Sequence, residues 1–337
     1  KQRDFFMSIV KMFNLYVESD TQNDRHLLIE PRDDFLTSDI VDWSQKLDNS
    51  KDVSYLPMGA LDSKDYLYTY KQDKDYYNKL YQDTWSEIYG QEKYEITNDF
   101  LKNEFKTELI FSPTCSVGQN YNQKVLPTIK LYDETLAAGH NEARLISNIR
   151  ILYYGGLKTG DWNHYHSGGF TVNLTYPYAG HYDDPFNPTL DLNFGINKEI
   201  YWDNTFAPIT ISDNTIFNKY HKKFIQEITD VNSKVVRGYF NLSPSDIKNL
   251  SFRKQFRFNN AYFRLNKIEN YNPSELTMCE FLKIKDAEVF VPTTTVINGG
   301  INGDLPVFTT SLITNNNSIS NQNVAAQGSA NYVNRSS

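Results

Sequence analysis

The sequence predicts a β-rich α+β protein in which small barrel-like modules carry short helices, an all-β domain is inserted, and an extended C-terminal arm follows. Three observations lead to this prediction. Short runs of alternating aromatic or branched residues recur between Gly, Pro and Asn turns. Only a few segments have helical periodicity. After Asp304 the chain loses every charged residue except Arg335.

Residues 1–111 are expected to form the first module, which begins with a helix and a hairpin. Over residues 4–15 apolar side chains recur at helical spacing, and Asp4 can cap the start. Residues 15–17 and 27–29 are short β-prone runs that flank a cluster of turn formers. The module therefore opens with a helix followed by a β-hairpin.

The rest of this module alternates between strands and one helix. Residues 66–70 alternate with the two-residue period of a strand. Residues 75–89 predict a helix, with Gly90 at the position of a left-handed C-cap. Further strands are expected around residues 94–96 and 108–111.

Residues 112–212 are expected to form the inserted β domain. Short runs are separated by Gly, Pro and Asn at close intervals, which is typical of a sandwich or barrel. Residues 149–153 and 170–174 are the clearest strands.

Residues 213–290 predict a second α+β module. Its expected elements are a helix capped by Asp213, a strand at 235–240, a helix beginning at Ser243, a hairpin at 256–265 turning at Asn259-Asn260, and a final strand at 279–284. The Ser-Pro-Ser-Asp sequence favours a helix start, because Pro lacks an N–H that the first turn does not use.

Residues 291–337 form the expected arm, which is mostly Asn, Ser, Thr, Gly and Ala. Such a segment has little apolar area to offset a backbone ordering cost of roughly 1–2 kcal/mol per residue. We expect it to lie on a neighbouring copy in a large assembly. The alternative is that it packs along its own domain.

Charge and cysteine content narrow the classes of function. A protein that binds duplex DNA through phosphates is usually basic, whereas this chain has a net charge of −7. We therefore expect at most weak, non-specific contact with passing DNA.

Cys115 and Cys279 are too far apart to indicate a disulfide framework, and we expect both to be reduced. No apolar run has the length of a membrane span, and we expect no signal peptide. Because the first residue is Lys1 and not Met, we expect a processed piece of a longer chain or a gene product that starts upstream.

Three stretches occur together and in order along the chain. They are MFNLYVE (12–18) running into LLIEP (27–31), DWSQKLD (42–48), and YFRLNKIENYNP (262–273) followed by CEFLKI (279–284). Together they resemble bacteriophage tail proteins of the baseplate-hub type, in particular the tail muzzle or ring proteins of crAss-like phages. The likeness covers residues 1–110 and 213–290. It implies hub-like modules, ring-forming subunits around a central tube, and no active-site residue.

Four residues are candidates for a metal site, namely His164, His166, His181 and Asp183. If His164 and His166 lie on a strand, they face the same side, and His181 or Asp183 could complete a three-ligand site. In a loop that spacing has no such meaning, and this segment is rich in Gly and Pro. We therefore assign no metal, cofactor or catalytic residue and keep the four as candidates beside exposed or interface histidines.

Other patterns that carry chemistry are absent or ambiguous. The sequence has no phosphate-binding loop, no nucleophile elbow and no His-Glu-x-x-His motif. Asp183 and Asp184 are adjacent, so on a strand they would point opposite ways and make a poor carboxylate pair. One basic cluster, interleaved with aromatic residues, contains Arg253, Lys254, Arg257, Arg264, Lys267, Phe252, Phe256, Phe258 and Tyr262. It could line a nucleic acid, but in a hairpin such aromatics more often form the core face.

The function expected from these observations is architectural and not enzymatic. Copies would form a ring around the DNA exit channel or close it, in contact with other tail proteins, in a virion assembled in the bacterial host cytoplasm. One alternative is a receptor- or glycan-binding adhesin, which predicts exposed Trp162, Tyr165, Tyr176 and Tyr178 around a groove. The other is a cell-wall hydrolase, which predicts a pocket with converging carboxylates or His ligands.

Overall fold

The computed structural model describes residues 1–20, 23, 25–57, 63–97, 101–119, 124–131, 147–166, 168–198, 201–202, 208–230, 232–283, 294–298, 300–301, 309–314 and 317–318. In this part of the chain sheets dominate over helices, which confirms the prediction of a β-rich α+β protein. No helix within it combines the length and the apolar character that a membrane crossing needs. Cys115 and Cys279 are both buried, and neither forms a disulfide with a described residue.

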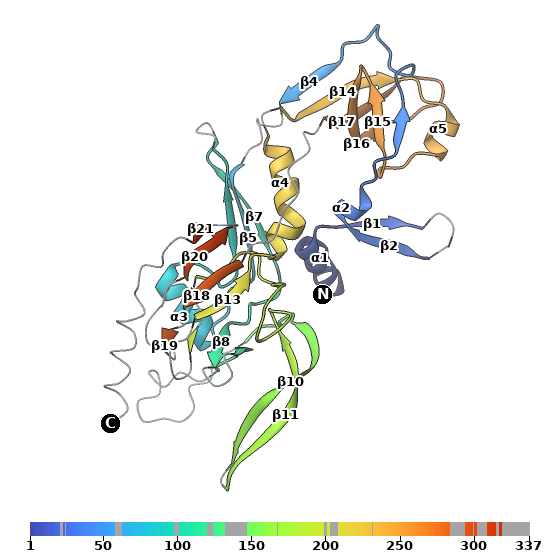
Figure 1. Cartoon of the computed structure of the whole chain (residues 1–337). Coiled ribbons are helices and arrows are strands. Elements are labelled where there is room, and N and C mark those ends of the chain that lie inside the picture. The colour runs from blue at the N-terminus through green and yellow to red at the C-terminus, as the bar shows by residue number, and fades with distance from the viewer. Residues whose placement is uncertain are drawn as a thin grey trace.

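The largest sheet has six strands and forms the upper lobe in Figure 1. Its order is β3 (Ile40–Asp42), β15 (Gln255–Phe258), β16 (Ala261–Glu269), β17 (Thr277–Lys283), β14 (Lys234–Phe240) and β4 (Ser54–Pro57). Neighbouring strands are antiparallel, except that β3 runs parallel to β15. The two edge strands precede residue 58, whereas the four central strands follow residue 233. The expected segments 1–111 and 213–290 therefore share one sheet, because strand pairing joins parts distant in sequence.

One face of the six-stranded sheet is covered by aromatic side chains. Every second residue is buried along the middle of β14, β15 and β17, as a strand with one covered face requires. Trp43, just after β3, packs on this face with its ring 4.5 Å from that of Phe256 and 6.0 Å from that of Phe281. This cluster is the core of the upper lobe.

Two local predictions for this lobe are confirmed. α5 (Pro244–Lys248) begins with a capping box in which the Ser243 side chain accepts from the backbone N–H of Asp246. The β15–β16 hairpin turns at Asn259 and Asn260, whose φ angles of 47° and 54° are those of a type I′ turn.

The lower body consists of the chain between β4 and β14, together with the N-terminal helix and the C-terminal strands. One sheet has the order β6 (Glu92–Glu95), β5 (Ser63–Thr69), β7 (Asn103–Glu108), and α3 (Tyr76–Trp85) follows β5 in the chain. The other sheets are built from β8 (Ser116–Gln119), β9 (Lys124–Pro127), β12 (Tyr201–Trp202), β13 (Pro208–Ser212), β18 (Thr294–Asn298), β19 (Gly300–Ile301), β20 (Thr309–Thr314) and β21 (Asn317–Ser318). The main core of the body joins Met12, Tyr68, Phe111, Phe194 and Phe217.

The N-terminal elements lie between the two lobes in Figure 1. They are α1 (Gln2–Phe13), β1 (Leu15–Ser19), β2 (Leu27–Pro31) and α2 (Arg32–Phe35), which confirms the predicted helix and hairpin. Arg32 forms a buried ion pair with Glu227 of α4 (Lys222–Thr229). Arg253 of the upper lobe pairs with Glu18 and Glu30 of the hairpin at 2.9 and 2.6 Å. These ion pairs connect the N-terminal elements to both lobes.

The predicted helix after Asp213 is present, but it starts with a π-helical turn, η3 (Phe217–His221), that continues into α4. Its capping side chain is Thr215 and not Asp213, because the Thr215 hydroxyl accepts from the backbone N–H of Asn218 at 3.3 Å. The π-turn places Nε2 of His221 3.0 Å from the carbonyl oxygen of Met12, to which it donates. This contact holds α1 against α4.

Two predicted elements are wrong in extent. Residues 147–152 have no regular structure, and the expected strand begins only at its last residue, Tyr153. The helix expected to end at Gly90 stops at Trp85, because Ser86 takes the left-handed conformation with φ 56°. Gly90 serves a close approach instead, since a Cβ there would lie 2.2 Å from Oδ1 of Asn193.

The described strands of the arm pair with their own chain. β18 is antiparallel to β13 over five residue pairs, and β19 is parallel to β12. β20 then pairs with β18. This part of the arm therefore follows the alternative in which it packs along its own domain, because β13 and β12 offer strand edges. Residues 319–337 lie outside the described residues.

Candidate functional site

The structure does not bring the four metal-site candidates together. His164 and His166 lie near the tip of β10 (Tyr153–His166), which pairs with β11 (Gly169–Gly180), and their side chains lie outside the described residues. His181 follows the opposite end of β11, and Asp183 lies two residues beyond it. At about 3.3 Å per residue the 12 residues of β11 place roughly 40 Å between the two pairs.

His181 is fully committed to hydrogen bonds with protein groups. Its Nδ1 donates to Oδ1 of Asn193 at 2.7 Å, and its Nε2 accepts from the backbone N–H of Thr114 at 3.1 Å. Burial lowers the pKa of His181 to about 4, so the ring is neutral near pH 7. Both ring nitrogens are therefore occupied.

Asp183 organises the loop that follows the hairpin. Its Oδ1 accepts from the backbone N–H groups of Thr189 and Leu190 at 2.8 and 2.9 Å. Among the described residues, no group of three or more His, Cys, Asp or Glu is arranged to hold a metal ion.

β10 and β11 form a two-stranded ribbon that projects from the lower body (Figure 1). The pairing runs from Tyr153 opposite Gly180 to His166 opposite Gly169 and is interrupted by two irregularities. In the part of the chain that the structure describes, neither strand pairs with a third. An isolated two-stranded hairpin is at best marginally stable in water, so a ribbon this long needs support.

One face of β11 carries an apolar stripe of alternate residues, Val172, Leu174, Tyr176 and Tyr178, which we call the β11 stripe. Tyr176 and Tyr178 are buried and line a groove with Leu126 and Pro127 beside β9. Leu174, in contrast, is 72% exposed and Val172 is 45% exposed. The chain covers the half of the stripe nearest the body and leaves the outer half uncovered.

The base of the ribbon is held by a buried cluster of charges. Arg150 forms ion pairs with Asp73 and with Asp75, and both carboxylates are fully buried. The Arg150 guanidinium also donates to the carbonyl oxygen of Pro113. A buried guanidinium between two carboxylates fixes the chain where it enters β10.

Two further contacts hold the ribbon farther along. Lys158 forms an ion pair with Asp184 at 3.0 Å. The Tyr178 hydroxyl donates to the carbonyl oxygen of Tyr182 at 3.0 Å, and burial raises the pKa of Tyr178 well above its usual range. The inner part of the ribbon is thus fixed to the body by side chains as well as by strand pairing.

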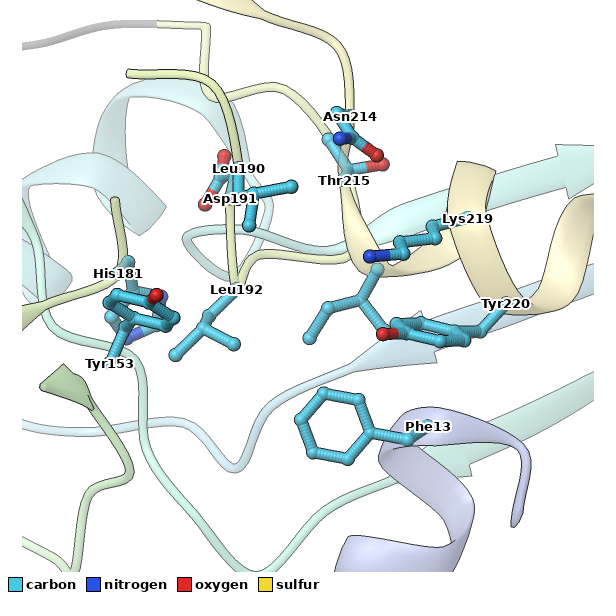
Figure 2. A pocket seen from close by; sticks show the side chains of 11 residues that line it. Phe13, Tyr153, His181, Leu190, Asp191, Leu192, Asn214, Thr215, Lys219 and Tyr220 are labelled. Atoms are coloured by element: carbon cyan, nitrogen blue, oxygen red, sulfur yellow. The ribbon is translucent and has the colours of Figure 1, made fainter. Parts of the chain in front are cut away.

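A cavity of about 230 Å³ lies beside the start of the ribbon and is shown in Figure 2. Phe13 of α1, Tyr153 at the start of β10, Leu192 and Tyr220 surround it. Its wall includes Asp191, whose Oδ1 accepts from the N–H of Asn193 at 2.8 Å.

Burial raises the pKa of the Asp191 carboxyl to about 7. Oδ2 of Asp191 makes no hydrogen bond with any described residue. The other titratable residues of the cavity wall are the fully bonded His181, Lys219 and two tyrosines. The wall therefore contains a single carboxylate, whereas the hydrolase alternative predicts a converging set of groups.

The basic cluster of the upper lobe is largely paired with carboxylates. Besides the two ion pairs of Arg253, Arg257 lies 4.0 Å from Asp42 and Lys267 lies 2.6 Å from Glu269. Phe256 and Phe258, which alternate with these cations, are each 1% exposed and belong to the sheet core. The core-face interpretation is confirmed for Phe256 and Phe258, whereas Phe252 and Tyr262 are exposed.

The glycan-binding alternative predicts exposed aromatic residues in this region. Tyr176 and Tyr178 are 6% and 4% exposed, so neither can stack on a sugar. The side chains of Trp162 and Tyr165 lie outside the described residues.

Sequence reasoning missed the groups that fix the ribbon. Asp73 and Asp75 precede a helix and resemble ordinary capping residues, and Arg150 lies in a run that looks like a strand. Their contact joins positions about 75 residues apart, which no local spacing indicates. The only local signal is the placement of one arginine among apolar residues.

No known protein family, curated protein or solved structure matches the chain. We therefore infer the function from the residues and geometry of the chain itself. Its most informative feature is the ribbon with the uncovered outer half of the β11 stripe.

Proposed function

We propose that this protein is a structural subunit of a bacteriophage tail, and that its copies form a ring around the DNA exit channel or close it. The main support is the ribbon, a projecting pair of strands that exposes Leu174 at 72% and Leu157 at 72%. Large apolar side chains on a projecting element are typical of a surface that packs against another protein. An assembly of many copies would supply that cover.

The six-stranded sheet gives a second line of support. In the described part of the chain it ends at β3 and β4, whose outer edges have no strand beside them. Free edges favour pairing with another chain, and closure into a ring removes them. The net charge of −7 suits a wall along which DNA passes with at most weak contact.

The test is the state of the protein in its native particle. We expect mass spectrometry of purified virions to find many copies per particle, and electron microscopy to place them in a ring in the tail. Absence of the protein from virions, or its presence as a single copy away from the channel, would overturn the proposal. A glycan array on the full chain tests the adhesin alternative, for which Tyr154, at 78% exposure, is the best remaining aromatic surface.

A further inference from the structure

We infer that the cavity between α1, the start of β10 and η3 binds a small aromatic carboxylate. The inference is independent of the proposed function, because a ligand site of this kind needs no neighbouring subunit. It depends on three observations, which are the size and lining of the cavity, the hydrogen-bond donors in its wall, and the helical turn that supplies two of them.

The cavity has the size and lining of a site for one aromatic ring with a short polar group. Its volume is about 230 Å³. An apolar cavity of roughly 150 Å³ is already large enough to hold benzene. Phe13 and Tyr220 meet edge to face in its wall with ring centroids 5.5 Å apart, an arrangement that a third ring can extend. The remaining apolar lining comes from Tyr153, Leu190, Leu192 and Ile216.

Four polar groups of the wall can donate hydrogen bonds, and none of them forms a hydrogen bond or ion pair with a described residue. They are the Lys219 ammonium, the Asn214 side-chain amide and the hydroxyls of Tyr153 and Tyr220. In Figure 2 the Lys219 and Tyr220 side chains extend from η3 toward the side of the cavity where Leu192 lies. One ammonium among neutral donors suits an oxygen anion of single charge, which is a carboxylate. A cationic ligand would be repelled by Lys219.

The carboxyl group of Asp191 does not oppose an anion at this place. Its Oδ1 accepts from the backbone N–H of Asn193, and its Oδ2 exposes less than 1 Å² to solvent. Burial raises the pKa of this carboxyl to about 7, so it is mostly protonated at pH 6. His181 has both ring nitrogens bonded to protein groups and is neutral at that pH. Lys219 is therefore the charge that a ligand meets at pH 6 among the described residues of the wall.

The turn that supplies Lys219 and Tyr220 has an unusual geometry. Both residues belong to η3, which is a π-helical turn at the start of α4. Single π-helical turns inside helices are rare and occur frequently at functional sites. The hydrogen bond from His221 to the Met12 carbonyl holds α1, and with it Phe13, against the same turn. One structural element thus positions both the aromatic wall and the ammonium.

The first experiment measures ligand affinity with the full chain at pH 6. Phenylacetate is the probe, and 2-phenylethanol is its uncharged counterpart. Isothermal titration calorimetry should give a dissociation constant of about 1 mM or lower for phenylacetate. The constant for 2-phenylethanol should be at least about fivefold higher, because it cannot pair with the ammonium.

Two lysine variants show whether Lys219 provides this preference. Lys219→Gln should raise the dissociation constant of phenylacetate about fivefold and change that of 2-phenylethanol less than about twofold. Lys223→Gln is the matched control, because this lysine lies farther along the same helix, 3.9 Å from Asp33, and does not line the cavity. It should leave both constants unchanged. Because Lys219 is exposed and forms no ion pair with a described residue, both variants should unfold at the wild-type temperature without ligand.

The second experiment locates the ligand without any substitution. On illumination 4-azidophenylacetate should label peptides that contain Phe13, Leu192 or Tyr220, and excess phenylacetate should suppress this labelling. Labelling elsewhere would overturn the inference, as would the absence of phenylacetate binding at about 10 mM. Equal affinity for phenylacetate and 2-phenylethanol, or an unchanged preference in Lys219→Gln, would also overturn it. None of these results bears on the proposed ring, which is tested in virions.

Discussion

The six-stranded sheet and the β10–β11 ribbon are built from similar sequences and end in opposite environments. Both alternate aromatic or branched residues with polar ones. In the sheet, Phe281 of β17 is fully buried and its ring is within 6.2 Å of the rings of Trp43, Phe240, Phe256, Phe258 and Phe263. In the ribbon, Leu174 and Leu157 are each 72% exposed.

Alternation of apolar and polar residues therefore predicts a strand, but it does not predict what covers the apolar face of that strand. The sheet strands gain their cover from segments of the same chain, notably Trp43 and Leu47. The ribbon is covered by its own chain only as far as Tyr176. Because one apolar face is covered and the other is exposed, substitutions in the two regions should have very different effects.

The largest difference is expected between a core residue of the sheet and an exposed residue of the ribbon. Phe281→Ala should lower the free energy of unfolding by about 3–5 kcal/mol, because it leaves a cavity among five other rings. Leu157→Ala, the matched ribbon variant, should change it by no more than about 0.5 kcal/mol. Urea denaturation of the purified monomer measures both. Equal losses would contradict the claim that the ribbon is uncovered.

A smaller loss is expected at the charged base of the ribbon. Arg150→Met removes the cation between two buried carboxylates and should cost about 3 kcal/mol. This loss lies at the lower end of the range for breaking a buried ion pair, because both carboxylates keep another donor. Asp73 also accepts from the backbone N–H of Asn148, and Asp75 accepts from the Asn78 side chain. Denaturation should be accompanied by faster hydrogen exchange in β10. Unchanged exchange there would show that Arg150 does not hold the ribbon.

The cavity wall should give a pH-dependent effect. Because burial raises the pKa of Asp191 from 3.8 to about 7, the folded chain binds this proton more tightly than the unfolded chain. Its contribution therefore lowers the free energy of unfolding as the pH rises from about 4 to about 7, and the loss persists above that range. Asp191→Asn keeps an oxygen acceptor for Asn193 and removes the titration.

We expect the wild type and Asp191→Asn to unfold with similar free energies at pH 4. At pH 8 the variant should be more stable by about 2 kcal/mol, because the wild type then buries a charge. Burial lowers the pKa values of His181 and His221 to about 4, so these residues make the free energy of unfolding rise with pH. This contribution is the same in the wild type and the variant, and it cancels in the difference. A constant difference between pH 4 and pH 8 would contradict the assignment.

The smallest effect is expected where the inner ribbon meets the body. Tyr178→Phe removes one hydrogen bond to the Tyr182 carbonyl and should cost about 1 kcal/mol. Tyr154→Phe, at an exposed tyrosine of the same ribbon, should be neutral within about 0.5 kcal/mol. Thermal unfolding of the pair distinguishes an anchored tyrosine from a free one, and identical midpoints would show that Tyr178 adds no anchor.

Local signals in the sequence predicted local structure well. The Asn259-Asn260 turn and the capping box at Ser243 depend on neighbouring residues only, and both are present. Predictions failed where a distant residue intervened. The run 149–153 has the composition of a strand, but Arg150 forms ion pairs with Asp73 and Asp75, which lie about 75 residues earlier in the chain.

The candidate site was less predictable than the fold for the same reason. The spacing of His164 and His166 indicates a shared face on a strand, but it contains no information about the roughly 40 Å that separates them from His181. The arm has few charged residues and is mostly Asn, Ser, Thr, Gly and Ala, yet β18 pairs with β13. Neither the groups that fix the ribbon nor the strands that receive the arm are adjacent in sequence.

The division of the six-stranded sheet along the chain has a consequence for biosynthesis. Pro57 of β4 pairs with Lys234 of β14. After β4 has been synthesised, the ribosome must therefore add about 180 further residues before this pairing can form. At about 5–20 residues per second this delay is roughly ten to forty seconds, during which the edges of β3 and β4 are open to other nascent chains. Prior folding of the segment between β4 and β14 brings these two strands near each other. It thereby reduces the entropic cost of closing the long loop between them. Connectivity therefore favours folding of the segment between β4 and β14 before the upper lobe, whereas β18 to β21 of the body are synthesised after both.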